Sequence, residues 1–214
     1  FITLEGIEGS GKTTEIKFLQ DYFKQKGIDC LFTREPGGTE IGGQIRKVLL
    51  SPANTALEPY AELLLYVADR VQHVNEIIVP ALDAGRWVVC DRFFDATLVY
   101  QGYARGLDVG IMRELHRTMC RNINPDLTVV FDLEPEQGLG RARGDLSSGA
   151  RGNEESRFEN ETLAFHRKIR NGYLDLAERD PIRFRVIDAS GTPAEVHELF
   201  MQELEDYIKI YEVR

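Results

Sequence analysis

The sequence predicts an α/β protein in which a five-stranded parallel sheet is flanked by helices on both faces, a three-layer α/β/α arrangement. Short apolar runs alternate with longer amphipathic segments along the chain, an order that is typical of parallel strands joined by helices. A glycine-rich loop joins the first strand to the first helix at residues 6–13. With 214 residues and no repeat of solenoid period, the chain is long enough for one sizeable core, so we expect a single domain spanning 1–214.

The glycine-rich loop has the spacing of a phosphate-binding loop. Its sequence is Gly6-Ile7-Glu8-Gly9-Ser10-Gly11-Lys12-Thr13, with Thr14 in the helical pattern that follows. Glycines let backbone N–H groups turn inward around an anion, and a helix that begins there adds the positive end of its dipole. We expect residues 6–14 to bind ATP, Lys12 to reach its β- and γ-phosphates, and Thr13 to hold Mg²⁺. The alternative is an ordinary glycine-rich turn between a strand and a helix.

The first helix is predicted from the helical spacing of Ile16, Leu19 and Phe23, and Gly27 marks its end. A second strand over residues 29–33 leads into the segment Arg34-Glu35-Pro36-Gly37-Gly38-Thr39. Open parallel sheets bind ligands at the carboxyl ends of their strands, where this segment lies. Pro-Gly-Gly alone indicates only a turn. Arg34, with Arg46 on the short helix that follows, keeps an anion-binding interpretation open.

A long helix is predicted from residue 57 to an end or bend near Pro80. Tyr66 and Arg70 are four residues apart, so both project from one side and can hold a flat polar ring by stacking and hydrogen bonding. The same spacing also occurs in ordinary surface pairs. We expect the core face to be Leu57, Tyr60, Leu64, Val67, Val71, Val74 and Ile78, and the other edge to carry Glu62, Tyr66, Asp69, Arg70 and His73.

The third strand, residues 87–90, ends in Asp91-Arg92-Phe93. An aspartate at the tip of a buried strand is where a phosphate-loop enzyme holds its Mg²⁺, directly or through water. Arg92 beside it can bind a phosphate through two parallel hydrogen bonds. A solvated pair at a strand end is the plainer alternative. A mixed segment containing Tyr100-Gln101-Gly102 follows, and then an amphipathic helix that carries Ile111, Leu115 and Met119.

Two further strands are predicted in the second half of the chain. Residues 127–133 are almost continuously apolar, as a strand covered on both faces requires, and residues 184–187 form the fifth strand. Between them, a helix that opens at Glu134 runs into a glycine- and serine-rich stretch with several arginines. We expect a lid over residues 141–157 that brings an arginine onto a transferring phosphate, with a passive disordered loop as the alternative. A capping box at Thr192 opens the last helix.

The composition argues against several kinds of partner. The formal net charge is −9, from 35 acidic and 26 basic residues, so we expect no binding to nucleic acid or to an anionic membrane. No apolar run approaches the length of a membrane span. The three cysteines, Cys30, Cys90 and Cys120, are widely spaced, which favours reduced thiols in a cytoplasmic protein over a disulfide framework or a metal site.

These motifs together resemble the thymidylate kinase family, over nearly the whole chain and in the same order: the phosphate-binding loop, the segment from Arg34 to Thr39, the Tyr66/Arg70 helix, Asp91-Arg92-Phe93, Tyr100-Gln101-Gly102 and the arginine-bearing lid. The resemblance implies a P-loop nucleoside monophosphate kinase fold that uses ATP to phosphorylate dTMP to dTDP, a step in dTTP synthesis. It also implies a homodimer formed through helices. Because Glu8-Gly9-Ser10 contains no arginine, the chain resembles the bacterial branch, in which lid arginines replace a loop arginine.

The resemblance implies roles for single residues as well. Glu8 matches the position near the acceptor sugar, Tyr66 the ring that stacks on thymine, and Arg70 the residue that bonds a base carbonyl. Tyr100 matches the ring against the deoxyribose, which disfavours ribonucleotides, and the loop at 188–190 borders the adenine. The acceptor phosphate is expected on Arg34, Arg46 and Arg92. The expected substrate site is Glu8, Arg34, Pro36, Arg46, Tyr66, Arg70, Arg92, Thr97, Tyr100 and Gln101, and the expected catalytic set is Lys12, Arg92, Arg143, Glu8 and Asp91.

The chain departs from the family pattern in two places. Around Ala96 and Thr97 the family usually offers a more polar pair to the base, which leaves Thr97 as the expected base contact. The lid is longer than usual between Arg143 and Arg157. Among Arg143, Arg151 and Arg157, we expect Arg143 to reach the transferring group.

The expected reaction needs no strong general base. The acceptor is a phosphate whose second pKa is about 6, so it is largely ionised near neutral pH. Transfer needs two anions placed in line and compensation of the charge on the migrating group, which Lys12, Arg92, a lid arginine, and Mg²⁺ on Thr13 and Asp91 supply. We therefore assign no catalytic role to His73, His116, His166 or His197.

Three other functions fit parts of the pattern. The nearest is another phosphate-loop kinase that acts on deoxycytidylate, uridylate or a nucleoside. A nucleotide-dependent switch or ATPase is disfavoured because the chain has no Asn/Thr-Lys-x-Asp motif and carries Arg92 where an ATPase usually has glutamate. A noncatalytic nucleotide-binding module is disfavoured by the full set of charge-compensating residues.

Overall fold

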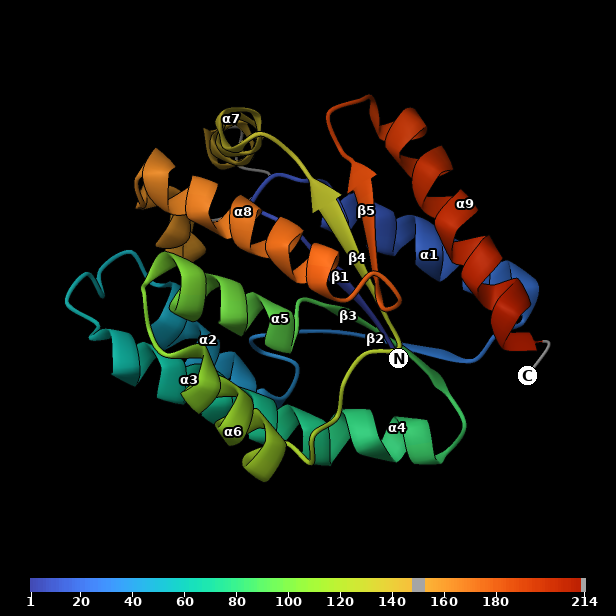
Figure 1. Cartoon of the computed structure of the whole chain (residues 1–214), viewed down its shortest axis with the longest axis horizontal. Helices are drawn as coiled ribbons and strands as arrows, with labels where there is room; N and C mark the ends of the chain where they lie inside the picture. Colours follow the sequence, from blue (N-terminus) through green and yellow to red (C-terminus); the bar gives the residue numbers. More distant parts are fainter. Residues whose placement is uncertain (148–152, 213–214) are drawn as a thin grey trace.

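The computed structural model describes residues 1–147 and 153–212 of the chain. Within them lies a sheet of five parallel strands in the order β2-β3-β1-β4-β5, so the predicted fold class is confirmed. The sheet stands at the centre of the molecule with helices on both sides (Figure 1). The strands are β1 (Ile2–Glu5), β2 (Cys30–Arg34), β3 (Trp87–Asp91), β4 (Leu127–Asp132) and β5 (Phe184–Asp188).

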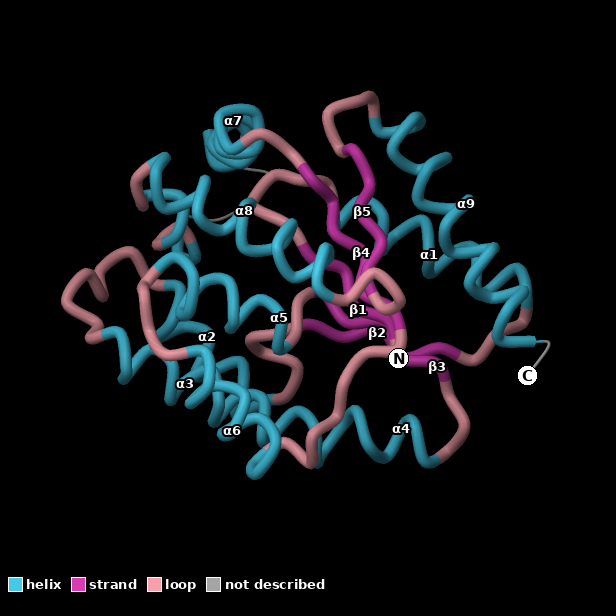
Figure 2. Tube along the Cα trace, viewed as in Figure 1, coloured by secondary structure: helices cyan, strands magenta, loops and turns pink. Residues whose placement is uncertain are grey.

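The helices form one layer on each side of the sheet. Helices α1 and α9 lie on one side, while α2 to α6 and α8 lie on the other (Figures 1 and 2). The α-helices are α1 (Lys12–Lys26), α2 (Glu40–Leu50), α3 (Pro59–His73), α4 (Val79–Asp83), α5 (Phe94–Thr97), α6 (Val109–Met119), α7 (Pro135–Ser147), α8 (Leu163–Arg179) and α9 (Pro193–Glu212). The π-helical segments η1 (Val74–Ile78) and η2 (Leu98–Ala104) follow α3 and α5, and the 3₁₀ turns are η3 (Asn153–Glu155) and η4 (Phe158–Asn160).

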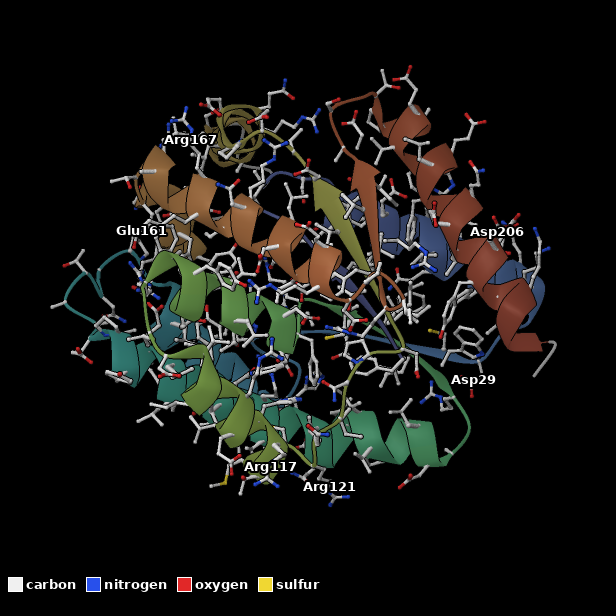
Figure 3. All side chains as sticks on the ribbon, viewed as in Figure 1. Asp29, Arg117, Arg121, Glu161, Arg167 and Asp206 are labelled. Carbon is white, nitrogen blue, oxygen red and sulfur yellow. The ribbon has the colours of Figure 1, made fainter. Side chains whose placement is uncertain are left out.

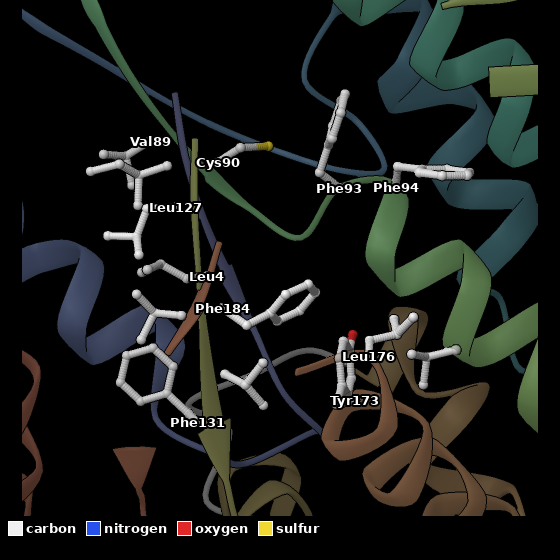
Figure 4. Packing of buried hydrophobic residues seen from close by; sticks show 14 of the residues in the cluster. Leu4, Val89, Cys90, Phe93, Phe94, Leu127, Phe131, Tyr173, Leu176 and Phe184 are labelled. Atoms are coloured by element: carbon white, nitrogen blue, oxygen red, sulfur yellow. The ribbon is translucent and has the colours of Figure 1, made fainter. Parts of the chain in front are cut away.

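The two faces of the sheet differ in chemistry. On the side of α1 and α9, Leu4, Val89, Leu127 and Phe131 form an apolar surface (Figure 4). The ring of Phe131 lies 5.4 Å from that of Phe200 on α9. On the side of α5 and α8, β1 and β4 place the hydroxyl groups of Thr3 and Thr128 2.9 Å apart in the interior. Buried polar groups need partners, so this second face is where helices contribute polar side chains to the core.

The parallel register brings three strand ends to one edge of the sheet. Asp91 at the end of β3 pairs with Leu4 of β1 on one side and with Arg34 of β2 on the other. The segments that follow these strands therefore emerge side by side, which is the usual place for a ligand in a sheet of this kind. They are the glycine-rich loop, the segment that begins at Arg34 and the segment that begins at Asp91.

The predicted long helix is divided into three parts. Helix α3 ends at His73, the π-helical segment η1 follows, and α4 begins one residue before Pro80. Proline has no N–H group and its ring crowds the carbonyl four residues earlier, so the helix widens before Pro80. The helical run does not end at the predicted position: it continues past Pro80 to Asp83, with the π-helical segment ahead of the proline.

The predicted core face of this helix is wrong for Tyr60 and Leu64. Their exposed fractions are 49% and 56%, whereas Glu62 and Arg70 on the predicted outer edge are 0% and 2% exposed. The charged side chains can be buried because each has ion-pair partners in the interior. Apolar periodicity located an apolar face of the helix, but that face lies on the surface of this chain.

Charged side chains project outward over the surface. Arg117, Arg167 and Asp206, on α6, α8 and α9, lie at the periphery of the molecule (Figure 3). Among the described residues, no helix combines the length and apolar character that crossing a membrane requires. The cysteines are free thiols, with Cys90 and Cys120 buried and Cys30 half-buried.

Candidate active site

A cleft with a volume of about 640 Å³ opens at the carboxyl edge of the sheet. It is lined by the glycine-rich loop, the ends of β2 and β3, side chains of α3 and η2, and the loop after β5. Gly6, Ile7 and Arg143 are predicted site residues that do not line it. The predicted residues that line it are Glu8, Gly9, Ser10, Gly11, Lys12, Thr13, Thr14, Arg34, Pro36, Arg46, Tyr66, Arg70, Asp91, Arg92, Thr97, Tyr100 and Gln101.

The backbone of the glycine-rich loop turns tightly at Gly9 and Gly11. Gly9 and Gly11 have φ values of 72° and 98°, and a Cβ atom at position 9 would lie 2.1 Å from the carbonyl oxygen of Gly138. No side chain caps the start of α1. Its first backbone N–H groups therefore remain available to an anion, as a phosphate-binding loop requires.

Lys12 is folded over this loop. Its Nζ donates to the carbonyl oxygens of Gly6 and Ile7, at 3.0 and 2.8 Å, and to Oγ of Ser10 at 3.2 Å. Gly6 and Ile7 thus contact the side chain of Lys12 through their carbonyl groups and do not line the cleft. Burial, followed by the positive charge of Arg92, lowers the pKa of Lys12 to about 8. A bound anion would raise that pKa again, so the site favours negatively charged ligands.

Asp91 ends β3 in the wall of the cleft. Its Oδ1 is buried and has no hydrogen-bond partner among the described residues. A buried carboxylate oxygen without a partner is unfavourable, and a divalent cation is one of the groups that can satisfy it. Thr13, the second predicted metal ligand, lines the same cleft. Both offer the oxygen ligands that Mg²⁺ prefers.

Arg92 has a left-handed backbone conformation, with a φ of 65°. This conformation costs a residue other than glycine about 1 kcal/mol. Two hydrogen bonds hold it in place: the Arg92 N–H donates to the carbonyl of Leu4 at 3.0 Å, and the Phe93 N–H donates to Oε1 of Glu5 at 2.8 Å. The guanidinium group lies 5.1 Å from the ring centroid of Tyr100. The strained turn therefore places this arginine in the cleft.

Glu5 and Tyr173 support Arg92 from the interior. Oε2 of Glu5 accepts a hydrogen bond from the Tyr173 hydroxyl at 2.6 Å, and Nη1 of Arg92 donates to the same hydroxyl at 3.3 Å. Burial raises the pKa of Glu5 to about 7. Tyr173 lies on α8, so a helix from late in the chain supports the arginine that directly follows β3.

Glu8 joins the glycine-rich loop to the opposite wall of the cleft. Its Oε1 accepts hydrogen bonds from the Tyr100 hydroxyl at 2.6 Å and from Nη2 of Arg92 at 3.2 Å. Burial alone would raise the pKa of Glu8. The opposite effect of His166 and Arg92 is larger, so the pKa lies well below its usual range. Glu8 is therefore ionised at neutral pH, and three predicted site residues meet in one cluster.

Tyr66 and Arg70 both line the cleft from α3. Nε of Arg70 donates to Oε2 of Glu35 and its Nη2 donates to Oγ1 of Thr97, both at 2.8 Å. Oε1 of Glu35 lies 2.8 Å from Nδ1 of His73. These contacts fix the orientation of the buried guanidinium group before any ligand binds.

Arg34 and Arg46, which we expected to bind the acceptor phosphate, both line the cleft. Nε and Nη2 of Arg46 donate to the two carboxylate oxygens of Glu155, at 2.8 and 2.7 Å, and Nη1 donates to the carbonyl of Pro36 at 2.9 Å. Glu155 belongs to the predicted lid. A carboxylate from the lid thus occupies the guanidinium edge that we expected to bind the acceptor phosphate.

The lid arginines have different environments. Arg143 is exposed, and its Nη2 donates to the carbonyl of Glu159 at 3.3 Å. Arg157 is buried, and its Nη2 donates to Oε2 of Glu62 at 2.6 Å. Arg151 lies outside the described residues. In this structure neither Arg143 nor Arg157 lines the cleft.

Comparison with known proteins identifies the family. A family model described as thymidylate kinase matches residues 4–200 of the chain. The chain belongs to the thymidylate kinase family. The thymidylate kinase of Desulfosudis oleivorans is 55% identical over 196 residues, 92% of each chain, and that of Syntrophotalea carbinolica is 57% identical over 92% of this chain and 90% of its own. A crystal structure of thymidylate kinase from Ehrlichia chaffeensis, 32% identical, matches 95% of this chain and 97% of its own with a TM-score of 0.74.

The resemblance to thymidylate kinases is therefore confirmed by both sequence and fold. Phosphorylation of dTMP to dTDP, with ATP as the co-substrate, is the activity of this family. The likeness covers the glycine-rich loop, the Arg34 and Asp91 segments and α3, which together line the cleft.

Sequence analysis gave no individual role at the site to Glu35, Arg141, His166 or Tyr173, which all belong to the cleft or support it. Glu35 lies inside the predicted segment from Arg34 to Thr39, in which only Arg34 and Pro36 were assigned to the site. Arg141 lines the cleft and donates to the carbonyl of Ala189 at 3.0 Å, in the loop expected to border adenine. His166 and Tyr173 are seven residues apart on α8 and so share one of its faces. That spacing is a signal, but it does not identify partners that lie far away in the sequence.

Proposed function

We propose that this chain transfers the γ-phosphoryl group of ATP to dTMP and gives dTDP for the synthesis of dTTP. Membership of the thymidylate kinase family supports the substrates and the reaction. The cleft supports the chemistry, because it combines an anion-binding loop with several arginines. The observation that carries the proposal is the meeting of Lys12, Asp91 and Arg92 in one cleft.

In this proposal ATP lies on residues 6–14, with the N–H groups of the loop and of α1 around its phosphates. Lys12 exchanges its carbonyl partners for the β- and γ-phosphates. The phosphate of dTMP lies on Arg34, Arg46 and Arg92, and one of its oxygens attacks the γ-phosphorus in line while the bond to ADP breaks. That oxygen is already ionised near neutral pH, so no residue has to remove a proton.

We propose Mg²⁺ as the metal ion of the reaction, with Asp91 and Thr13 as its protein ligands. The unpartnered, buried Oδ1 of Asp91 supports this assignment, as does the position of Thr13 in the lining of the same cleft. When bound, the ion would neutralise charge on the β- and γ-phosphates.

We propose that thymine lies against Tyr66 and within reach of Arg70, with Pro36, Thr97 and Gln101 around it. Glu8 and Tyr100 would then contact the deoxyribose. The proposal is supported by the position of all these side chains in one cleft and by the fixed orientation of Arg70.

The exchange of Tyr66 for alanine tests the base site. Loss of stacking should raise the KM for dTMP roughly tenfold, because stacking of a base on an aromatic side chain contributes about 1–3 kcal/mol. The KM for ATP should stay unchanged, and Tyr66→Phe, which keeps the ring, should behave like the wild type. Steady-state kinetics with each substrate varied in turn would measure this. An unchanged KM for dTMP in Tyr66→Ala would remove Tyr66 from the base site.

The proposed reaction is tested by measuring ADP release with and without dTMP. We expect release to depend on dTMP and to stop when EDTA removes the metal ion. Deoxycytidylate, uridylate and thymidine in place of dTMP should give much lower turnover at the same concentration. Faster turnover with one of them would contradict the assignment of dTMP. Release without any acceptor would indicate an ATPase, and no release at all would indicate a binding module.

We propose that residues 1–214 form one kinase domain and that residues 141–157 act as its lid. Support comes from Ala142 and Glu155 at either end of this segment, which both line the cleft. Within the lid we propose Arg143 as the catalytic arginine. It is exposed and its hydrogen bond to Glu159 is long, so little opposes its movement into the cleft, whereas Arg157 is tied to the buried Glu62.

We propose that two copies of the chain form a homodimer through helices. Exposed apolar side chains on neighbouring helices usually mark a protein interface, and α3 and α6 are in contact. They carry Tyr60, Leu64, Ile111 and Met119, whose exposed fractions are 49%, 56%, 47% and 51%.

The exchange of Leu64 for glutamate tests this interface. A charge in an apolar contact should dissociate the dimer, so light scattering should give about half the wild-type mass. Ile182→Glu is the matched control, since Ile182 is 87% exposed and lies before β5. It should leave the mass unchanged. A monomeric wild type, or a Leu64→Glu variant of undiminished mass, would contradict the proposed dimer.

We further propose a cytoplasmic location. The free state of Cys30, Cys90 and Cys120 supports a reducing compartment. A role in nucleotide synthesis fits the same compartment.

A further inference from the structure

His166 connects two parts of the cleft from a fully buried position on α8. Its side chain is 0% exposed. Its Nε2 lies 2.9 Å from the carbonyl oxygen of Phe158, and its Nδ1 lies 3.3 Å from Oε2 of Glu8. Phe158 and Glu8 both line the cleft, one just after the lid and the other in the glycine-rich loop. The imidazole ring is thus placed between two elements that contact the substrates in the proposed function.

The partners of His166 determine where its protons lie. A backbone carbonyl oxygen only accepts, so Nε2 must carry a proton. An ionised carboxylate also only accepts, so a neutral ring would direct the lone pair of Nδ1 at Oε2 of Glu8. Both of these atoms are buried, and neither has a hydrogen-bond partner among the described residues. A proton on Nδ1 removes the conflict, because the ring becomes a cation and the 3.3 Å contact becomes an ion pair.

The proton belongs on His166 rather than on Glu8. The other oxygen of Glu8 accepts from the Tyr100 hydroxyl and from Nη2 of Arg92, at 2.6 and 3.2 Å. Lys12, at the start of α1, adds a second positive charge in the same cleft. Glu8 is thus faced by Arg92 from the end of β3, Tyr100 from η2, Lys12 from α1 and His166 from α8. Two hydrogen-bond donors and nearby cations stabilise the ionised carboxylate.

We propose that His166, protonated on both ring nitrogens, is a positioning residue that fixes the orientation of Glu8 toward the acceptor nucleotide. The inference rests on the proposed function, in which Glu8 contacts the sugar of dTMP. Through its second nitrogen His166 also fixes Phe158, whose ring lies 5.2 Å from that of Tyr100. His166 therefore acts on the acceptor site through Glu8 and Phe158, without contact with either nucleotide.

The protonation of His166 can be measured without turnover. In protein labelled with ¹⁵N in its histidine rings, both nitrogens of His166 should have the chemical shifts of an imidazolium at neutral pH. In Glu8→Gln the ring should become neutral, because the carboxylate that stabilises the cation is gone. His197 is the internal control: it forms a comparable pair with Glu15, at 2.9 Å, and its shifts should not change. A neutral His166 ring in the wild-type enzyme would overturn the inference.

The kinetic test uses His166→Phe, which keeps an aromatic ring and removes the charge. The KM for dTMP should rise about tenfold, the size expected for a lost hydrogen bond or ion pair to a charged group. The KM for ATP should stay unchanged, since the loop N–H groups and Lys12 remain. His197→Phe should leave both values unchanged. A folded His166→Phe variant with the wild-type KM for dTMP would contradict the proposed role.

These results separate the inference from the function on which it rests. A wild-type enzyme that releases no ADP in response to dTMP would refute the proposed function, and with it the role of His166 toward the acceptor. An active wild type with a neutral His166 ring would refute only the inference. If His166→Phe does not fold, the nitrogen chemical shifts of His166 in the wild type and in Glu8→Gln still decide whether the ring is a cation held by Glu8.

Discussion

Replacement of Lys12 by alanine is expected to lower kcat for dTMP-dependent ADP release by a factor of about 10²–10³ while the fold survives. In the proposed function, this lysine is the cation that binds the transferring phosphate. Its burial disfavours the charged form in the free protein, as its lowered pKa indicates. The alanine variant should therefore unfold at no lower temperature than the wild type, measured by circular dichroism at pH 7.

Lys17→Ala is the matched control for this experiment. Lys17 lies on the same helix and is exposed, so its loss should change neither kcat nor the unfolding temperature. Near-wild-type turnover in Lys12→Ala would contradict the assigned phosphate site.

Lys12 also predicts a pH dependence of ATP binding. Its pKa in the nucleotide-free protein is about 8, below the value of 10.5 for an unperturbed lysine. The stability cost of burying the charge is therefore fully present below pH 8 and disappears as the pH rises from 8 to 10.5. The folded, nucleotide-free enzyme loses this charge, which binds ATP in the proposed function, as the pH rises through about 8. Calorimetry should find weaker ATP binding at pH 9 than at pH 7 in the wild type, and a smaller change in Lys12→Arg.

Replacement of Arg92 by alanine is the second change with a large expected effect. Arg92 lies in the cleft between Glu8 and Tyr173. In the proposed function, its positive charge stabilises the acceptor phosphate and the migrating phosphoryl group. Loss of an arginine that stabilises the transition state lowers kcat by about 10³ or more. We expect the KM for dTMP to rise much less than kcat falls, and steady-state kinetics separate the two.

Two further variants make the Arg92 experiment specific. Arg92→Lys keeps the charge but loses the planar guanidinium group that can form two parallel hydrogen bonds to a phosphate. Its kcat should therefore lie between those of the wild type and Arg92→Ala. Arg113→Ala removes an exposed arginine of α6 and should have no effect. If Arg92→Ala retained wild-type kcat, the arginine would have only a structural role at its strained turn.

The parts of the site that the sequence predicts are those encoded by neighbouring residues. The spacing of Gly6, Gly11, Lys12 and Thr13 is enough to indicate a phosphate-binding loop, because the loop is built from its own backbone. The four-residue spacing of Tyr66 and Arg70 likewise places both on one side of a helix, and both line the cleft.

The parts that could not be predicted depend on contacts between distant segments. The residues that neighbour Arg46 in the sequence do not indicate that Glu155 forms an ion pair with it. The residues that neighbour Glu8 do not indicate that His166 contacts it. The face of α3 that carries Glu62 and Arg70 is buried only because other elements provide their partners. Apolar periodicity alone therefore selected the wrong face for Tyr60 and Leu64.

The sequence by itself determined the order of strands and helices along the chain and indicated the glycine-rich loop as a phosphate site, because both follow from short-range spacing. The family was indicated by the resemblance of its motifs to those of thymidylate kinases. The tertiary structure decided which charges are paired, which lid residue holds Arg46 and which histidine contacts Glu8. The physical reason is that a buried charge is tolerated only beside a partner, and that partner comes from whichever segment the fold brings within a few ångströms.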